Sequence, residues 1–395
     1  MTKKSDAPAI RFKGFSDAWE QRKLGELGTI TTGNTPSTSI PDYYSDDGIV
    51  WVTPTDICEN ITFESARKLS DLGQQVGRVV PKNTILVTCI ASIGKNTMLG
   101  NTGSFNQQIN GLTPNENKYD PYFLLTESAL WSAKMKGSAA SGTMQIVNRT
   151  EFSELKTWLP SLIEQQAIGA FFKQLDNLIT LHQRKFEKLT NVKKSMLEKM
   201  FPQNGSSYPE IRFKGFTDPW EQRKFEEIAV RSSVICSDDT LPRVEYEDIV
   251  SGTGRLNKDI YAKQSIKSGI AFHQGDVLYG KLRPYLQNWL LPTFDGLAVG
   301  DFWVLQPQNA DSSFLYRLIQ SRQFDEVANQ STGTKMPRAD WKLVSKTVFS
   351  IPSNISEQAA IGTYFTALDS LITLHQRELE KLQNIKKSML EKMFV

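Results

Sequence analysis

Two long stretches of the sequence place apolar residues, with one histidine in each, alternately four and three positions apart. In residues 164–201 these positions are Ile168, Phe172, Leu175, Ile179, His182, Phe186 and Leu189, and in residues 357–394 they are Ile361, Phe365, Leu368, Ile372, His375, Leu379 and Leu382. This spacing is typical of a coiled-coil seam and narrower than the apolar face of a bundle helix. It predicts two helices of roughly 38 residues, each spanning about 57 Å, that pair along these seams, and we expect the pairing to be antiparallel.

Polar residues mark the ends of these helices. Ser161 and Glu164 form a capping box at the first helix start, and Asn354 and Glu357 offer the same arrangement at the second. Pro202 ends the first helix, because proline cannot continue a helical hydrogen-bond ladder.

Other polar residues on the helices have two interpretations. His182 and His375 occupy equivalent seam positions, where we expect a polar residue that fixes the helix register; metal ligation is the alternative. Lys193-Lys194 and Lys386-Lys387 are expected to form a solvated face, with contact to DNA phosphates as the alternative. On the helices alone, a generic dimerisation rod explains the pattern equally well.

The chain also repeats itself. A short block at residues 8–27 returns at 209–228, each copy containing IRFKGF and then EQRK. The helical stretch 164–201 returns at 357–394, and both copies end in KKSMLEKMF. Matches of this length are not chance, so the chain is organised as a covalent dimer with pseudo-two-fold symmetry.

The segments between the repeats, about 28–160 and 229–352, hardly resemble each other. A scaffold duplicated around dissimilar inserts predicts one support that carries two specificities. The predicted organisation is a first domain at 1–160, a spacer helix at 161–201, a second domain at 202–352 and a C-terminal spacer helix at 353–395.

Each insert combines β-rich runs with helical stretches. The runs 49–52 and 84–88 in the first insert, and 276–279 and 302–305 in the second, read as strands. Helical patterns follow near residues 122–136 and 313–327. Because strands and helices do not alternate as in a doubly wound sheet, the fold class predicted is α+β: two mixed domains joined by two long antiparallel coiled-coil helices.

Composition bears on the partners and the cellular compartment of the protein. Lys and Arg number 46 and Asp and Glu 43, a net charge of +3 that neither requires nor excludes an anionic partner. The sequence has no apolar run long enough for a membrane helix, and its N-terminus is polar. Its three cysteines are scattered, with no CxxC spacing. We therefore expect a cytoplasmic protein that neither enters a membrane nor holds a metal.

Candidate DNA-binding residues are polar and basic groups among the turns of each insert. Arg and Lys can bind guanine edges or phosphates, and Asn and Gln match adenine edges; otherwise such residues cap turns or face solvent. The candidates are Lys95, Asn106, Gln107, Gln108, Thr143 and Arg149 in the first insert, and Lys281, Arg283, Tyr285, Lys335 and Arg338 in the second.

No pattern in the sequence indicates a catalytic site. There is no GxxxxGK[ST] phosphate loop, no HExxH, and no Asn/Asp-Pro-Pro-aromatic stretch of the kind that adenine methyltransferases use. Only three histidines occur, and two of them lie in the predicted helices. We expect a chain without catalytic residues and without a bound cofactor.

Along its whole length the chain resembles the specificity subunits of type I restriction-modification systems. One departure is an extra residue between Ile351-Pro352 and Glu357 in the second copy. The resemblance is carried by the openings at 14–23 and 215–224, the helix start at 159–168, the endings at 193–201 and 386–394, and the strand-turn features at 275–278 and 282–286.

The resemblance implies two target-recognition domains on an antiparallel helical spacer, each reading one half of an asymmetric, bipartite site in double-stranded DNA. It implies two methyltransferase subunits on the repeated scaffold, which bring S-adenosylmethionine, and two endonuclease-translocase subunits that use ATP and Mg. Three alternatives stay open: an orphan two-domain DNA-binding adaptor that recruits other machinery, a self-sufficient methyltransferase, and a pure coiled-coil scaffold.

Overall fold

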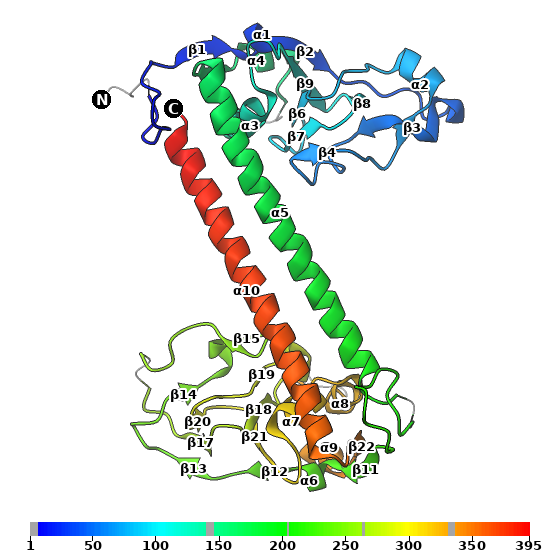
Figure 1. Cartoon of the computed structure of the whole chain (residues 1–395), viewed down its shortest axis with the longest axis vertical. Coiled ribbons are helices and arrows are strands. Elements are labelled where there is room, and N and C mark those ends of the chain that lie inside the picture. Colours follow the sequence, from blue (N-terminus) through cyan, green and yellow to red (C-terminus); the bar gives the residue numbers. More distant parts are fainter. Residues whose placement is uncertain (1–6, 140–145, 204, 263–264, 331–335) are drawn as a thin grey trace. The chain divides into compact units, whose positions relative to one another are not determined.

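The computed structural model describes residues 7–139, 146–203, 205–262, 265–330 and 336–395 (Figure 1). It divides into two compact units, Met1–Gln183 with Arg377–Val395 and Arg184–Gln376. Each unit holds one globular domain and one end of each long helix. The compact units therefore share each long helix between them, a different partition from the four segments that the repeats predict.

The first domain is built on a five-stranded sheet with the order β2-β9-β6-β7-β4. Its pairs are antiparallel except for β4 with β7. Every residue of the central strand β6 is buried, and α3 packs on β6 and β7. The strands are β2 (Gly28–Thr32), β9 (Ile109–Pro114), β6 (Ile85–Thr88), β7 (Asn96–Leu99) and β4 (Ile61–Thr62).

Smaller elements complete the first domain. A three-stranded sheet joins β5 (Lys68–Leu69), β3 (Tyr44–Val52) and β8 (Gly103–Phe105), and β1 (Glu20–Lys23) pairs with β10 (Lys156–Leu159). The helices are α1 (Leu24–Leu27), α2 (Asp71–Val76), α3 (Pro121–Ala139) and α4 (Arg149–Glu154), with a 3-10 turn η1 (Pro41–Tyr43).

The second domain repeats this plan with different residues. Its main sheet has the order β12-β21-β18-β19, and a second sheet has the order β13-β17-β20-β14. These strands are β12 (Ala229–Ser232), β21 (Phe302–Pro307), β18 (Val277–Gly280), β19 (Trp289–Leu290), β13 (Ile235–Cys236), β17 (Gly269–Phe272), β20 (Gly296–Ala298) and β14 (Arg243–Val244). Two further pairs are β15 (Ile249–Val250) with β16 (Arg255–Leu256) and β11 (Glu221–Lys224) with β22 (Val348–Ile351).

The helices of the second domain are α6 (Phe225–Ile228), α7 (Ser312–Leu318), α8 (Arg322–Ala328) and α9 (Trp341–Lys346), with 3-10 turns η2 (Tyr246–Asp248) and η3 (Pro284–Leu286). The predicted helical stretch at 313–327 is thus two helices, because the Ser321 hydroxyl accepts a hydrogen bond from the Phe324 amide (3.4 Å) and begins a new helix there. The four predicted strands are confirmed as β3, β6, β18 and β21, although Thr84 and Asp276 lie one residue before β6 and β18.

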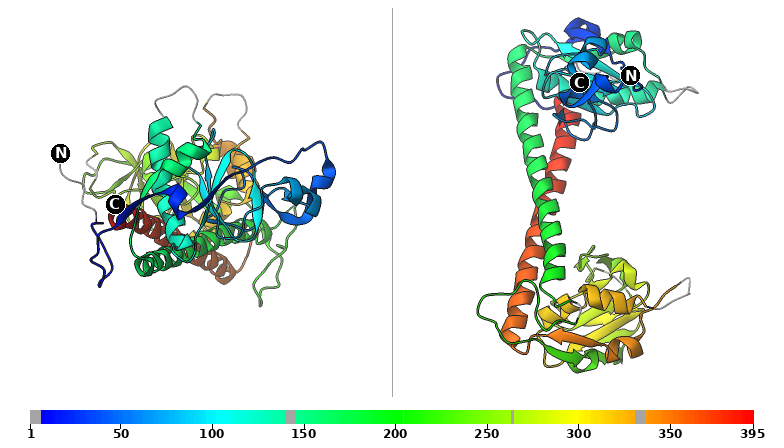
Figure 2. Two further views of the ribbon diagram at one scale, coloured as in Figure 1. Left: turned by 90° about the horizontal axis from the view of Figure 1, so that it is seen from above. Right: turned by 90° about the vertical axis from the view of Figure 1, so that its right-hand side faces the viewer.

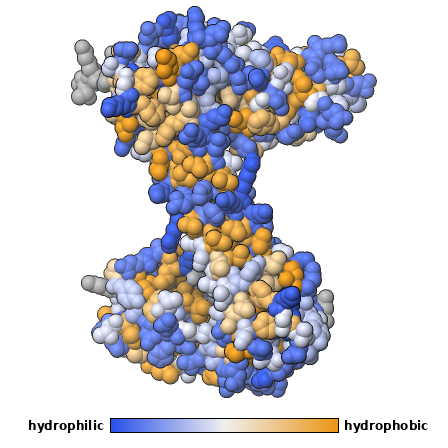
Figure 3. Space-filling model, viewed as in Figure 1, coloured by the Kyte–Doolittle hydropathy of each residue, from blue (hydrophilic) through white to orange (hydrophobic). Residues whose placement is uncertain are grey.

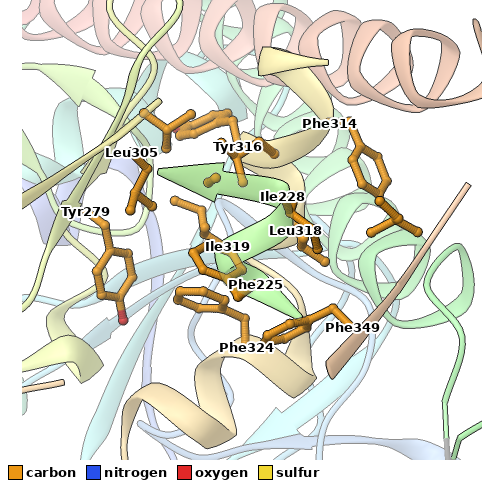
Figure 4. Close-up of a cluster of buried hydrophobic side chains, with 14 of the residues drawn as sticks. Phe225, Ile228, Tyr279, Leu305, Phe314, Tyr316, Leu318, Ile319, Phe324 and Phe349 are labelled. Carbon is orange, nitrogen blue, oxygen red and sulfur yellow. The ribbon is translucent and has the colours of Figure 1, made fainter. Parts of the chain in front are cut away.

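Aromatic residues dominate the core of the second unit (Figure 4). Phe225 from α6, Phe324 from α8 and Phe349 from β22 are fully buried and contact one another, with ring centroids 5.2 to 5.8 Å apart. Ring pairs at these separations add to the free energy of burial. Phe324 also contacts Tyr279 of β18, with ring centroids 5.2 Å apart, and this contact packs α8 against the main sheet.

The two long helices are α5 (Leu162–Lys199) and α10 (Ile355–Met393), with 38 and 39 residues. In the first unit the start of α5 lies beside the end of α10, and Lys386 Nζ is 2.6 Å from Asp176 Oδ1. In the second unit the equivalent pair joins Lys193 and Asp369, also at 2.6 Å. The helices run antiparallel, as predicted (Figures 1 and 2).

The predicted seam residues are all at least half-buried. Phe172 also contacts Phe394, the residue that follows α10, with ring centroids 5.8 Å apart. The buried ones are Ile168, Phe172, Leu175, Ile361, Phe365, Leu368 and Leu379, and those of intermediate exposure are Ile179, His182, Phe186, Leu189, Ile372, His375 and Leu382. The seam is therefore most deeply buried near the start of each helix, where it also joins a domain core.

Neither predicted capping box forms in full. In the second, the Asn354 side chain accepts from the Ser356 amide (2.8 Å) and not from the Glu357 amide. The Glu164 amide does lie 3.4 Å from the Ser161 hydroxyl. The Glu164 carboxylate, however, accepts two hydrogen bonds from Arg11 (2.6 and 2.8 Å). Glu357 pairs in the same way with Arg212 (2.7 and 2.8 Å). Both glutamates are buried, so a guanidinium supplies the charge that their burial requires.

The short repeated block also contacts the other long helix. In the first unit the Ile10 amide donates to the Lys392 carbonyl (2.9 Å), and in the second the Ile211 amide donates to the Lys199 carbonyl (2.9 Å). One block therefore binds the start of one helix through its arginine and the end of the other through its backbone. This explains why the short block repeats together with the helices.

A buried glutamine attaches each helix start to its domain. Gln165 accepts a hydrogen bond from the Asp120 amide (3.0 Å) and donates to the Pro160 carbonyl (2.9 Å). Gln358 makes the equivalent two bonds in the second unit (2.9 and 2.7 Å). Each domain is thus hydrogen-bonded to the helix pair through the same Glu-Gln dipeptide.

A buried carboxyl group makes the stability of the first unit depend on pH. Glu127 on α3 lies in the core, where it accepts hydrogen bonds from Thr157 and from the Trp158 amide. Burial raises the pKa of Glu127 to about 8. The folded chain therefore binds this proton more tightly than the unfolded chain, whose glutamate pKa is about 4.3. The stabilisation is fully present below that value and is lost as the pH rises towards 8.

We therefore expect the unfolding free energy of the first unit to fall by up to about 4 kcal/mol between pH 5 and pH 8. Glu127→Gln, which cannot ionise, should remove this part of the pH dependence. Denaturant unfolding of both proteins across this range provides the measurement. Parallel pH profiles for the two proteins would contradict the assignment.

None of the helices in the described part of the chain combines the length and the hydrophobicity that crossing a membrane requires.

Candidate nucleic-acid interface

Three candidate residues of the second domain, Lys281, Arg283 and Tyr285, lie in a strained turn between β18 and β19. Arg283 (φ 49°, ψ 64°) and Gln287 (φ 55°, ψ 45°) both adopt the left-handed conformation, on either side of η3. A non-glycine residue in this conformation costs about 1–2 kcal/mol. Such strain is found at functional sites, where the surrounding structure enforces it.

Backbone hydrogen bonds to the segment before α9 hold this turn. The Arg283 amide donates to the Pro337 carbonyl (2.7 Å), and the Ala339 amide donates to the Lys281 carbonyl (2.9 Å). The Leu282 amide donates to the Tyr246 hydroxyl (3.0 Å). The turn therefore has a fixed shape in the second domain.

The structure brings four of the predicted residues together here. Lys281 Nζ lies 3.5 Å from Asp301 Oδ1, and Arg338 Nη2 lies 2.9 Å from Asp301 Oδ2. No described residue accepts a hydrogen bond from the Arg283 guanidinium, and its Nε is buried without a partner. Tyr285 is exposed at the tip of the turn. Asp301 neutralises only part of the charge of Lys281, Arg338 and Arg283, so the site has a net positive charge that suits an anionic polymer.

The sequence did not identify Asp301 or Tyr246 as part of this site. Asp301 precedes β21, and the Tyr246 hydroxyl donates to its carbonyl oxygen. An acidic residue before a strand carries no distinctive local signal. Only the sheet pairing of β18 with β21 brings Asp301 beside the turn.

The first domain contains the same backbone arrangement with other side chains. Ala91, the third residue after β6, is left-handed (φ 60°). Ile90 bridges to Ile146, and the Val147 amide donates to the Cys89 carbonyl (2.9 Å). In the second domain Leu282 bridges to Arg338 in the same way. The two dissimilar inserts therefore share one backbone framework at this turn.

The predicted polar residues of the first domain lie around this framework. Lys95 is exposed, and its ammonium group donates to the Pro54 carbonyl (3.0 Å). Asn106 is buried and donates to the Gln108 side chain (3.0 Å). The Gln108 carbonyl in turn accepts from the Cys89 amide (2.8 Å), which joins the amide cluster to the turn.

The remaining candidates are more dispersed. Gln107 is exposed and contacts Thr35. Arg149 is exposed at the first position of α4, whose N-cap is Asn148. Thr143 and Lys335 lie outside the described residues.

In each lysine pair of the long helices, one lysine forms an ion pair and the other is exposed. Lys193 and Lys386 form the ion pairs between α5 and α10 described above, whereas Lys194 and Lys387 are exposed. In the ranges that the structure describes, no group of three His, Cys, Asp or Glu side chains could hold a metal ion.

Two α+β domains of one plan, each with a held turn and each hydrogen-bonded to a repeated long helix, define an internally duplicated two-domain protein. Residues 16–191 and 219–384 match the type I restriction modification DNA specificity domain family. The chain belongs to this family, as the sequence resemblance predicted.

Individual relatives agree with this assignment. The chain is 22% identical to the type I restriction enzyme MjaIX specificity subunit of Methanocaldococcus jannaschii, over 95% of this chain and 92% of that protein. It is 28% identical to the HindI specificity subunit of Haemophilus influenzae over 41% of this chain and 37% of that one. The crystal structure of the type I restriction-modification S subunit from M. genitalium has the same fold, with a TM-score of 0.66, 14% identity and coverage of 98% and 99% of the two chains.

Proposed function

We propose that this chain is the non-catalytic subunit that selects the DNA site of a type I restriction-modification complex. Each domain reads one half of an asymmetric, bipartite site, and the paired helices set the spacer between the halves. The observation that carries this proposal is one held turn in both domains with different side chains on it: Lys281, Arg283 and Arg338 in one, Ala91 and Ile146 in the other.

The repeated helices suit a partner that binds twice. Leu178 and Leu181 on α5 are 46% exposed, and their repeat equivalents on α10, Leu371 and Leu374, are 44% and 51% exposed. Hydrophobic residues are also visible on the face of the long helices that is turned toward the viewer in Figure 3. Exposed leucines at equivalent positions of a repeat support one methyltransferase subunit on each copy, because solvated apolar side chains gain free energy on burial.

The chemistry then belongs to the partners. Methyltransferase subunits supply S-adenosylmethionine, and restriction subunits supply the ATP- and Mg-dependent steps. This chain contributes binding, orientation and sequence selection, in a complex that works on cytoplasmic DNA.

Exchange of one domain tests the proposal. Replacing residues 28–160 with the corresponding domain of another family member should change the first half-site only, because the repeated block and Glu164-Gln165 remain in place to hold it. Mapping N6-methyladenine in cells that express the chimera with its methyltransferase gives the readout. If both recognised half-sites change in the chimera, or neither does, the two domains do not read their half-sites independently.

A further inference from the structure

One backbone position is shared by the recognition turns of both domains. Ala91 and Arg283 are each the third residue after an interior strand of their sheet, β6 and β18, and each is left-handed. The residue two positions before each accepts the same cross-segment hydrogen bond at 2.9 Å, Cys89 from Val147 and Lys281 from Ala339. The two positions are equivalent, and the turns differ in what they present there.

The side chains at these positions differ in chemistry. Arg283 presents a guanidinium, and the residue bridged to its neighbour is Arg338. Ala91 is exposed and presents only a methyl group, and the corresponding bridged residue is the exposed Ile146. A turn that keeps the same backbone conformation in both domains but carries different side chains is suited to determine DNA-sequence specificity.

The three cations of the second turn are held differently. Asp301 accepts from Arg338 and lies near Lys281, so both charges have an internal partner in the free protein. Within the described chain the Arg283 guanidinium has no acceptor, although its backbone is fixed at φ 49° and its side chain is half-buried. A half-buried donor group without a partner is costly unless a ligand supplies the acceptor.

A guanidinium is a planar fork that matches two acceptors at once. Guanine presents O6 and N7 side by side in the major groove, and bidentate Arg–guanine pairing is the commonest specific contact in DNA recognition. Phosphate contacts need charge but little directional control, which suits the flanking Lys281 and Arg338 better than Arg283, whose backbone is held in place.

We propose that Arg283 is a specificity-determining residue that binds O6 and N7 of a guanine in the second half-site, while Lys281 and Arg338 contact the DNA backbone. This inference rests on the proposed function of the domains. It assigns the class of base to one residue, and it makes position 91 the equivalent reading position of the first domain.

The test uses the full chain assembled with its methyltransferase subunits. Glycine adopts the left-handed conformation without strain, so Arg283→Gly keeps the turn and removes the guanidinium. We expect its discrimination for guanine at one position of the second half-site to fall by about 5- to 150-fold, with every other position unchanged. Arg283→Lys, which keeps the charge but not the fork, should relax the same position.

Two matched variants complete the design. Ala91→Gly makes the same backbone change in the first domain and should leave the second half-site unaltered. Lys281→Ala should weaken binding uniformly across sequences and lower the slope of log affinity against log salt by about one. The readouts are methylation mapping and competition binding with oligonucleotides varied at each position.

Two results would overturn the assignment: a second half-site without a required guanine, or an Arg283→Gly protein whose affinity falls uniformly while its motif is unchanged. The second result would make Arg283 a phosphate contact. Failure of the wild-type complex to recognise a split site at all would instead refute the proposed function.

Discussion

Glu357→Ala should lower the unfolding free energy of the second unit by about 3 to 5 kcal/mol. The Glu357 side chain is buried, accepts both Arg212 hydrogen bonds (2.7 and 2.8 Å), and lies 3.2 Å from the Trp220 indole nitrogen. Truncation would leave a guanidinium and an indole without their acceptor in a buried site. Glu164→Ala should destabilise the first unit similarly through Arg11.

Denaturant unfolding gives the magnitude, and hydrogen exchange at the start of α10 identifies the unit affected. The double variant Arg212→Met/Glu357→Met should recover most of the loss, because replacing both members of a buried pair by apolar groups is often close to neutral. Glu221→Ala, which breaks an exposed pair with Arg223, should change stability by at most about 1 kcal/mol. A Glu357→Ala effect as small as that of Glu221→Ala would show that the pair does not hold the helix to its domain.

Lengthening both long helices should lengthen the unread spacer of the DNA site. Four residues inserted between Leu175 and Leu189, and four between Leu368 and Leu382, extend each helix by about 6 Å and turn it by roughly 40° beyond one full rotation. One base pair adds about 3.4 Å along the duplex. The expected site keeps both half-sites and gains one to two base pairs between them.

Methylation mapping of the inserted protein reads the spacer directly. Thr180→Ala, an exposed substitution in the same region of α5, changes no length and should leave the spacing unaltered. An insertion protein that methylates at the original spacing would refute the idea that the helices act as a ruler.

The parts of the fold that follow from local periodicity were predictable. The four-three spacing around Phe172 and Phe365 identified both long helices, because a helix places such residues on one face whatever surrounds it. The β-rich run at 84–88 identified β6, whose residues are buried on both faces.

The parts that depend on distant residues were not predictable. Glu164 was assigned to a capping box, but its partner is Arg11, 153 residues away. The left-handed backbone of Arg283 is held by hydrogen bonds between its turn and the segment at 337–339. No local sequence pattern predicts these hydrogen bonds. The residue types at the turn suggested DNA contact, while their arrangement around Asp301 required the tertiary structure.

The proposed function requires two unlike domains that each read a separate half of one DNA site. Genome-wide mapping of N6-methyladenine in cells that express this chain with its methyltransferase subunits addresses that claim directly. We predict a motif of two defined halves separated by a fixed number of unspecified base pairs, with one methylated adenine in each half. A single continuous motif would contradict the account.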